Sequence, residues 1–340
     1  MDYVKWKWLY YDKLNYVKEY IRYRVCQMSE NIIGKPYWMK NHFCAGRPLL
    51  SIVQTNKIIG EAIDKGNPYW CGRFGDTEMK MIYAYLTYMQ TGNSTLRKAA
   101  TNQLCNNAGF FPNDIEKSSQ FAELMISVCN QIDLQGQWAR YMEDYVYLTY
   151  QKHTRLSHLF HLEPWNMYLH PRSKVKPWSS KLKGKKVLVI HPFVETIEKQ
   201  YNTNRENLFE KIFAAEDILP EFELKTLKAV QTAAGEVDDR FEDWFQALNW
   251  MIEECKKIDF EIAIIGCGAY GYPLAAEIKK MGKIAIHLGG ATQLLFGIMG
   301  RRWEVENPEF CEKVTNEYWT RPAENEKIRN SLQIEEGCYW

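Results

Sequence analysis

A glycine turn that joins an apolar strand to a helix constrains the fold of this chain more than any other feature. The turn has the pattern G-x-G-x-x-G over residues 266–271, follows the apolar run 261–265 and precedes a helical pattern. Further apolar runs at 186–190, 222–230 and 283–288 alternate with helical patterns. Strands separated by helices of this length predict a Rossmann-like α/β fold, with flanking helices on a mostly parallel sheet.

Helix starts are predicted between these strands. Asn204 is a suitable N-cap for a helix that runs to Phe213. Asp238 or Asp239 is suited to start a long helix whose apolar face ends at Cys255.

Composition is that of an ordinary globular protein. The chain has 340 residues, of which 46% are hydrophobic and 25% charged, which is enough for one large or two small domains. The formal charge of +1 predicts no nucleic-acid partner. Nine cysteines without a C-x-x-C pair argue against a structural zinc site and predict reduced thiols. The first residues lack the apolar core of a secretory signal, so we expect a cytoplasmic location.

The chain is predicted to have four segments. They are an N-terminal helical extension (1–45), a metal-loop half (46–171), a basic linker (172–186) and a glycine-loop half (187–340). Apolar residues recur at helical spacing over 14–28, which predicts an amphipathic helix that packs on the protein's own core or rests weakly on the inner face of a membrane. The stretch 107–150 is predicted to form core-facing helices. The lysine-rich linker is typical of a solvated segment or of an anion-facing patch.

A second glycine-containing turn, WCGRFGDTE at residues 70–78, brings acidic and basic groups together. Gly72 lets the backbone turn after a short apolar run, so that Asp76 and Glu78 lie at a helix N-terminus. Two hard oxygen ligands leave positions for water and phosphate oxygens on Mg²⁺ or Mn²⁺, and Arg73 can pair with phosphates in a forked geometry. The alternative is helix capping, with Asp76 as the N-cap and Glu78 in the first turn.

The turn at 266–271 also has the features of a nucleotide-phosphate loop, because its glycines permit close backbone approach before a helix. Dinucleotide folds place an acid at the end of the next strand, but the sequence there is His287-Leu288-Gly289-Gly290. The alternative is that the glycines only pack a helix against a strand. The candidate ligand-binding residues of the two turns and of the strand end at 287–290 are Gly72, Arg73, Gly266, Gly268, Tyr270, Gly271, Gly289 and Gly290.

These segments resemble the bacterial glycosyltransferases with the GT-D fold, over roughly residues 51–322. The resemblance is carried by GRFGDTE, by VLVIHPFVETIEKQY with RENLF, and by IGCGAYGYPLAAEIKKMGKIAIHLGGATQLLFGIMGRRW. It implies a nucleotide-sugar fold, a metal bound through an Asp-x-Glu motif at Asp76 and Glu78, and a role in building surface polysaccharide or protein-linked glycan. Thr77 stands where the family more often has glycine, which leaves both carboxylates in place.

We therefore expect a metal-dependent glycosyltransferase that moves a sugar from a nucleotide-diphosphate donor, such as a UDP-sugar, to a glycan, lipid-linked or protein-linked acceptor. Candidates for the catalytic base are His191 and His287, at the ends of predicted strands, and Glu163 in the turn HLEPWN. Each of them is equally suited to a structural role. The alternatives are an NAD(P)-dependent sugar-modifying oxidoreductase, which the missing acid opposes, and a non-catalytic nucleotide-binding subunit of a glycan-assembly complex, which the two carboxylates oppose.

Overall fold

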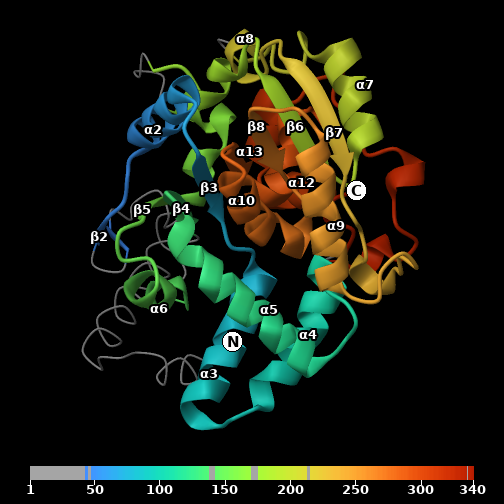
Figure 1. The fold of residues 1–340 in the computed structure, drawn as a ribbon. Helices are drawn as coiled ribbons and strands as arrows, with labels where there is room; N and C mark the ends of the chain where they lie inside the picture. The colour runs from blue at the N-terminus through green and yellow to red at the C-terminus, as the bar shows by residue number, and fades with distance from the viewer. Residues whose placement is uncertain (1–42, 45–46, 138–141, 170–174, 213–214, 335) are drawn as a thin grey trace, which may run out of the picture.

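A single parallel sheet of seven strands lies at the centre of the structure (Figure 1). The computed structural model describes residues 43–44, 47–137, 142–169, 175–212, 215–334 and 336–340. The strand order is β5-β4-β3-β9-β8-β6-β7, and every neighbouring pair is parallel. The strands are β3 (Tyr69–Arg73), β4 (Leu134–Gln137), β5 (Arg155–His158), β6 (Lys186–His191), β7 (Glu223–Lys228), β8 (Ile262–Ile265) and β9 (Ile284–His287). A small antiparallel pair, β1 (Phe43–Cys44) and β2 (Arg47–Pro48), stands apart.

Helices cover both faces of the sheet, which confirms the predicted Rossmann-like α/β class. One layer contains α3 (Asp76–Thr91), α4 (Thr95–Ala108), α5 (Ile115–Val128), α6 (Met142–Thr149), α9 (Trp244–Lys257) and α10 (Gly271–Lys280). The other contains α2 (Ile52–Lys65), α7 (Val194–Asn204), α8 (Ala215–Ile218), α11 (Thr292–Leu295), α12 (Arg301–Glu306) and α13 (Pro308–Val314). The strands therefore need apolar side chains on both faces, and in β6 Leu188 faces the first core while Val187 and Val189 face the second.

One sheet joins the metal-loop half to the glycine-loop half. Tyr69 of β3 lies opposite Ile284 of β9, which itself pairs with β8 on its other side. The strands predicted at 186–190, 222–230, 261–265 and 283–288 are confirmed as β6, β7, β8 and β9. The sheet thus places the end of β9 between the ends of β3 and β8, the two strands that the two glycine-containing turns follow.

The prediction that 107–150 is mostly helical is wrong in its central part. Residues Leu134–Gln137 form β4, with the sequence LQGQ, and β5 was also not predicted. The glutamines are buried polar residues instead of the apolar ones that a central strand usually shows. The Oε1 of Gln135 accepts a hydrogen bond from the Tyr272 hydroxyl (2.8 Å), which satisfies it in the interior.

The predicted helix starts are also wrong. Asn204 is the last residue of α7, and residues 205–212 form turns. The helix α9 begins later than predicted because Asp243 caps it through its side chain. Asp238 instead forms an ion pair with Arg240 (2.6 Å).

Lysines in the described part of the basic linker, residues 175–186, pair with acids from other segments. The pairs are Lys176–Asp217 (2.8 Å), Lys181–Asp64 (2.8 Å), Lys185–Glu261 (3.0 Å) and Lys186–Asp259 (2.5 Å). Such exposed pairs add little stability, but they balance the local charge. The amphipathic helix predicted over 14–28 lies outside the described residues. Within the part of the chain that the structure describes, no helix is long and apolar enough to cross a membrane.

Candidate active site

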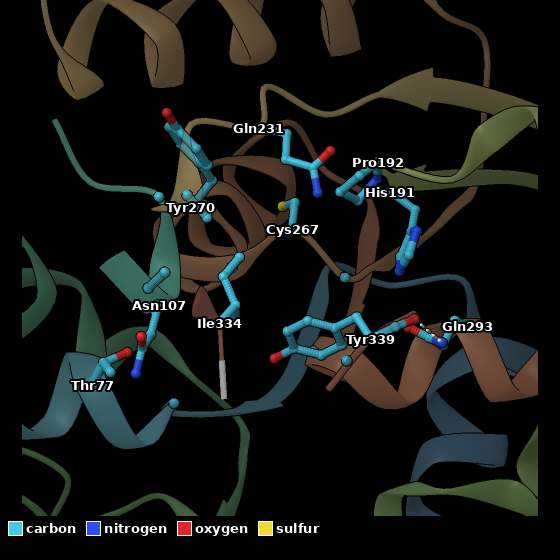
Figure 2. A pocket seen from close by; sticks show the side chains of 18 of the residues that line it. Thr77, Asn107, His191, Pro192, Gln231, Cys267, Tyr270, Gln293, Ile334 and Tyr339 are labelled. Carbon is cyan, nitrogen blue, oxygen red and sulfur yellow. Dashed lines mark hydrogen bonds between the residues drawn. The ribbon is translucent and has the colours of Figure 1, made fainter. Parts of the chain in front are cut away.

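A cavity of about 520 Å³ opens at the carboxyl ends of the parallel strands. Its walls come from the residues that follow β3, β6, β7, β8 and β9, from the end of α4, and from the segment that includes Ile334, Tyr339 and Trp340. Figure 2 shows Thr77 and Asn107 on one side, His191 and Gln293 on the other, and the ring of Tyr339 between them. Ligands of open α/β sheets bind at this edge.

The topology explains why a cavity forms at this point. The neighbouring strands β3 and β9 are followed by helices on opposite faces, since α3 belongs to one core layer and α11 to the other. Backbone that leaves adjacent strands in opposite directions opens a crevice between them, the topological switch point of a doubly wound sheet.

Most of the predicted site residues meet in this cavity. The lining includes Arg73, Asp76, Glu78, His191, Gly266, Gly268, Tyr270, His287, Gly289 and Gly290. Gly72, Gly271 and Glu163 are not part of it. Residues some 200 positions apart in the chain are thus brought together, because β9 pairs with β3.

Arg73 is the last residue of β3 and is only partly buried. Its Nε donates a hydrogen bond to the Leu288 carbonyl (3.2 Å), which fixes the guanidinium beside the turn after β9. Burial lowers the pKa of Arg73, while the nearby carboxylate of Glu163 raises it. An arginine keeps its charge through such shifts, so Arg73 presents a fixed cation to the cavity.

Asp76 and Glu78 both lie in the first turn of α3 and line the cavity. The N-cap is Gly75, so the alternative that Asp76 caps the helix is wrong. The carboxylate of Asp76 lies 2.6 Å from the Lys80 Nζ. Glu78 is only 7% exposed, and its Oε2 accepts a hydrogen bond from the Thr77 hydroxyl (3.0 Å).

The carboxylate of Glu78 folds back over the start of its own helix. A Cβ on Gly75 would lie 1.9 Å from the Glu78 Oε2, so only glycine allows this position. Burial raises the pKa of Glu78, and the hydrogen bond from Thr77 lowers it. A neighbouring cation would offset the cost of keeping this carboxylate charged.

The two carboxylates have the donor chemistry of a Mg²⁺ or Mn²⁺ site, because both supply hard oxygen ligands. Within the described ranges, no group of three or more histidine, cysteine, aspartate or glutamate side chains could hold a metal ion. Asp76 and Glu78 would therefore fill only part of a coordination shell, which suits a cation that keeps several waters and shares phosphate oxygens with a substrate.

His191 ends β6 and presents a hydrogen-bond donor to the cavity. Its Nδ1 accepts a hydrogen bond from the Phe193 backbone N–H (3.0 Å), and burial lowers its pKa to about 3. The neutral ring must therefore carry its proton on Nε2. This arrangement makes His191 a donor to a bound ligand and argues against the predicted role as a base.

His287 ends β9 and is held between two glycine backbones. A Cβ on Gly271 would lie 2.3 Å from its Nε2, and a Cβ on Gly72 would lie 2.8 Å from its Cβ. Burial and the charge of Arg73 lower its pKa to about 3. Gly72 and Gly271, predicted as ligand-binding residues, thus make room for this ring, and its fixed position favours a structural role for His287.

The glycines of the 266–271 turn pack tightly as well as lining the cavity. A Cβ on Gly266 would lie 2.6 Å from the Gly289 carbonyl oxygen, and one on Gly268 would lie 2.8 Å from the Ala108 carbonyl oxygen. Tyr270 stacks on Trp244, with ring centroids 5.0 Å apart. Packing accounts for all three glycines, while Gly266 and Gly268 also border the ligand space.

Several cavity residues were not predicted. They are Asn107, Gln231, Gln293, Arg302, Tyr339 and Trp340, among others. Arg302 lies in the MGRRW sequence at the end of a recognised block, which was a usable signal. Gln293 lies in the same block, within HLGGATQLLFGI. No motif surrounds Asn107, Gln231, Tyr339 or Trp340, and only the tertiary fold brings them to the cavity.

Comparisons of this chain with protein-family models, with curated proteins and with solved structures found no match.

Glu163 is predicted to make the protein's stability depend on pH. Its carboxylate is partly buried and accepts a hydrogen bond from the Asn166 Nδ2 (2.9 Å), and burial raises its pKa to about 7. The stability contributed by its protonated form is complete below about pH 4.5 and is lost as the pH rises to about 7. We expect Glu163→Gln, which keeps the hydrogen-bond acceptor, to remove this loss.

The difference in unfolding free energy between Glu163→Gln and the wild type measures the effect. It should grow in favour of the variant between pH 5 and pH 8, by on the order of 2 kcal/mol after allowance for partial exposure. Urea unfolding at several pH values gives this difference. If the difference in unfolding free energy is the same at every pH between 5 and 8, the pKa of Glu163 is not raised.

Proposed function

We propose that this chain is a metal-dependent glycosyltransferase of the GT-D type, which moves a sugar from a nucleotide-diphosphate donor such as a UDP-sugar. The observation that carries the proposal is the set of Arg73, Asp76 and Glu78 at one cavity wall. A guanidinium that pairs with phosphate, next to two hard metal ligands, is suited to a diphosphate and a divalent cation together. The resemblance of three sequence blocks to GT-D enzymes points the same way.

Charge balance supports a cation in this reaction. The cavity lining contains the carboxylates of Asp76, Glu78 and Glu306 and the guanidiniums of Arg73 and Arg302. The carboxylates would weaken the binding of a diphosphate to the two arginines, and a metal ion that neutralised them would strengthen it. Mg²⁺ or Mn²⁺, when bound, would stabilise the charge that develops on the leaving diphosphate.

The chain's own residues then have separate tasks. Asp76 and Glu78 would hold the metal, and Arg73 would pair with phosphate oxygens. His191 would donate its Nε2 proton in a hydrogen bond to an oxygen of the donor substrate. These groups lie on strand ends and on the first turn of a helix, which hold them in fixed positions.

The acceptor is proposed to be a growing glycan, free or carried on a lipid or a protein. Nucleotide sugars are cytoplasmic metabolites, so we place the reaction on that side of any membrane. A weak membrane contact of the extension 1–45 stays a prediction, because nearly all of that segment lies outside the described residues.

A thermal-shift titration tests the proposal against a nicotinamide cofactor. UDP and a panel of UDP-sugars with Mn²⁺ should raise the melting temperature by about 5 °C at saturating ligand, since a ligand stabilises the state that binds it. NAD⁺ and NADH should give no shift, because the strand after the glycine turn ends at His287 without an acid. A shift with NADH alone, or an equal UDP shift in excess EDTA, would contradict the proposal.

A further inference from the structure

We propose that Arg302 and Arg73 act as a pair that binds the two phosphates of the donor substrate from opposite sides of the glycine turn 289–290. The inference deepens the proposed function and rests on it for the identity of the ligand. It assigns a binding role to Arg302, which lines the cavity but was not among the predicted site residues.

Arg302 is held against the chain instead of extending into solvent. Its guanidinium carbon lies 4.9 Å from the centre of the Tyr339 ring, and its Nη1 lies 3.4 Å from the Tyr339 hydroxyl. Its Nη2 lies 3.4 Å from the Cys338 Sγ, and its backbone N–H donates to the Cys338 carbonyl (3.0 Å). A guanidinium fixed in this way loses little conformational entropy when it binds an anion.

The turn after β9 lies against both Arg73 and the Tyr339 ring over which the Arg302 guanidinium is held. A Cβ on Gly289 would lie 2.8 Å from the Arg73 Nη2, and a Cβ on Gly290 would lie 2.6 Å from the Tyr339 ring. Two residues without side chains therefore let Arg73 approach one side of the turn and the Tyr339–Arg302 pair approach the other. Figure 2 shows the Tyr339 ring within the cavity. The Arg302 guanidinium lies over this ring.

Electrostatics agree with this geometry. The charge of Arg302 lowers the pKa of Arg73, so the two cations act on each other across the cavity. The carboxylates of Glu163 and Glu78 act on Arg73 in the opposite direction, and Glu306 at the end of α12 also lines the cavity. An anion with two phosphates could accept a forked pair of hydrogen bonds from each guanidinium and relieve their repulsion.

Calorimetric titration of the full-length protein with inorganic pyrophosphate, at low salt and in EDTA, tests the pair without metal or nucleoside. The wild type should bind, and Arg302→Gln should weaken binding at least tenfold. Arg302→Lys should lie between them, because lysine keeps the charge but not the fork. The matched control is Arg301→Gln, because Arg301 is exposed, pairs with Glu336 (2.9 Å) and does not line the cavity.

The outcomes separate this inference from the function on which it rests. Loss of pyrophosphate binding in Arg302→Gln, with an unchanged melting temperature and an unaffected Arg301→Gln, supports the pair even if no sugar donor is ever turned over. Equal losses in both variants, absence of binding in the wild type, or normal binding in Arg302→Gln overturns it. Sugar transfer that Arg302→Gln leaves unchanged would overturn the proposed arginine pair but not the proposed function.

Tyr339→Phe is the second test variant, used if Arg302→Gln does not fold. It retains the ring but lacks the hydroxyl near Arg302, so it should weaken pyrophosphate binding a few-fold.

Discussion

Replacing Glu78 by glutamine is expected to lower metal-dependent sugar transfer by about 10²- to 10³-fold while the protein stays folded. A metal that stabilises a leaving group contributes several kcal/mol to the transition state, and each 1.4 kcal/mol is about tenfold in rate. Glutamine keeps an oxygen that accepts the hydrogen bond from Thr77, and it removes a buried carboxylate whose pKa is raised. The unfolding free energy should therefore stay equal or rise slightly. Asp76→Asn should lose activity in the same way.

The matched control for Glu78→Gln is Glu116→Gln. Glu116 also lies in the first turn of its helix, α5, but it does not line the cavity. Both variants lose a negative charge near a helix N-terminus, so they share the loss of its interaction with the helix dipole. Donor hydrolysis or sugar transfer, measured as a function of Mn²⁺ concentration, tests whether Glu78 binds the metal. Wild-type rates in Glu78→Gln, or rates that excess EDTA leaves unchanged, would contradict the metal assignment.

Substitution of Gly268 by alanine is expected to destabilise the protein by about 3 kcal/mol. Gly268 has φ +55°, where a side chain costs about 1 kcal/mol. Its Cβ would also lie 2.8 Å from the Ala108 carbonyl oxygen, and such overpacking costs about 1–3 kcal/mol more. The loop and the end of α4 would have to move apart, and both border the cavity.

Gly184→Ala separates the two costs. Gly184 has φ +72°, but a Cβ there would meet nothing within 4 Å. It should therefore lose only about 1 kcal/mol. Denaturant unfolding of both variants, followed by donor titration of the folded protein, tests the packing. If Gly268→Ala is no less stable than Gly184→Ala yet binds the donor poorly, the loop serves ligand binding more than packing.

The glycine-loop half was predictable because its strands repeat one simple pattern. In β6, β8 and β9, apolar side chains point to both faces of the sheet, so short continuous apolar runs mark them in the sequence. The helix α10 was predicted for a similar reason, since its apolar face is regular and Gly282 follows it with φ +82°.

Strand β4, next to the edge strand β5 in the metal-loop half, was not predictable in this way. In β4, the buried Gln135 and Gln137 replace apolar residues and are satisfied by partners distant in sequence, such as Tyr272 and His158. A four-residue strand with two glutamines carries no periodic signal, and its glutamines can be buried because of their tertiary hydrogen bonds.

Several residues of the candidate site could be predicted from sequence motifs, but the role of each residue could not. The sequence placed Arg73, Asp76 and Glu78 on one turn, and the structure keeps them together at the cavity. Which ring nitrogen of His191 carries the proton depends on the Phe193 backbone N–H. The space for the His287 ring depends on glycines of two different segments. Such details come from three-dimensional neighbours and leave no trace in local sequence.

While the chain is being synthesised, the centre of its sheet stays open until β9 has left the ribosome. Tyr69 cannot pair until Ile284, its partner in the central strand pair, has been synthesised. The hydrogen bond from Arg73 to Leu288 spans 215 positions. Contacts of such long range close slowly, because a large loop has to be ordered first. The cavity between β3 and β9 is therefore among the last parts of the protein to form, so a nascent or truncated chain that lacks β9 holds both motifs but has no site.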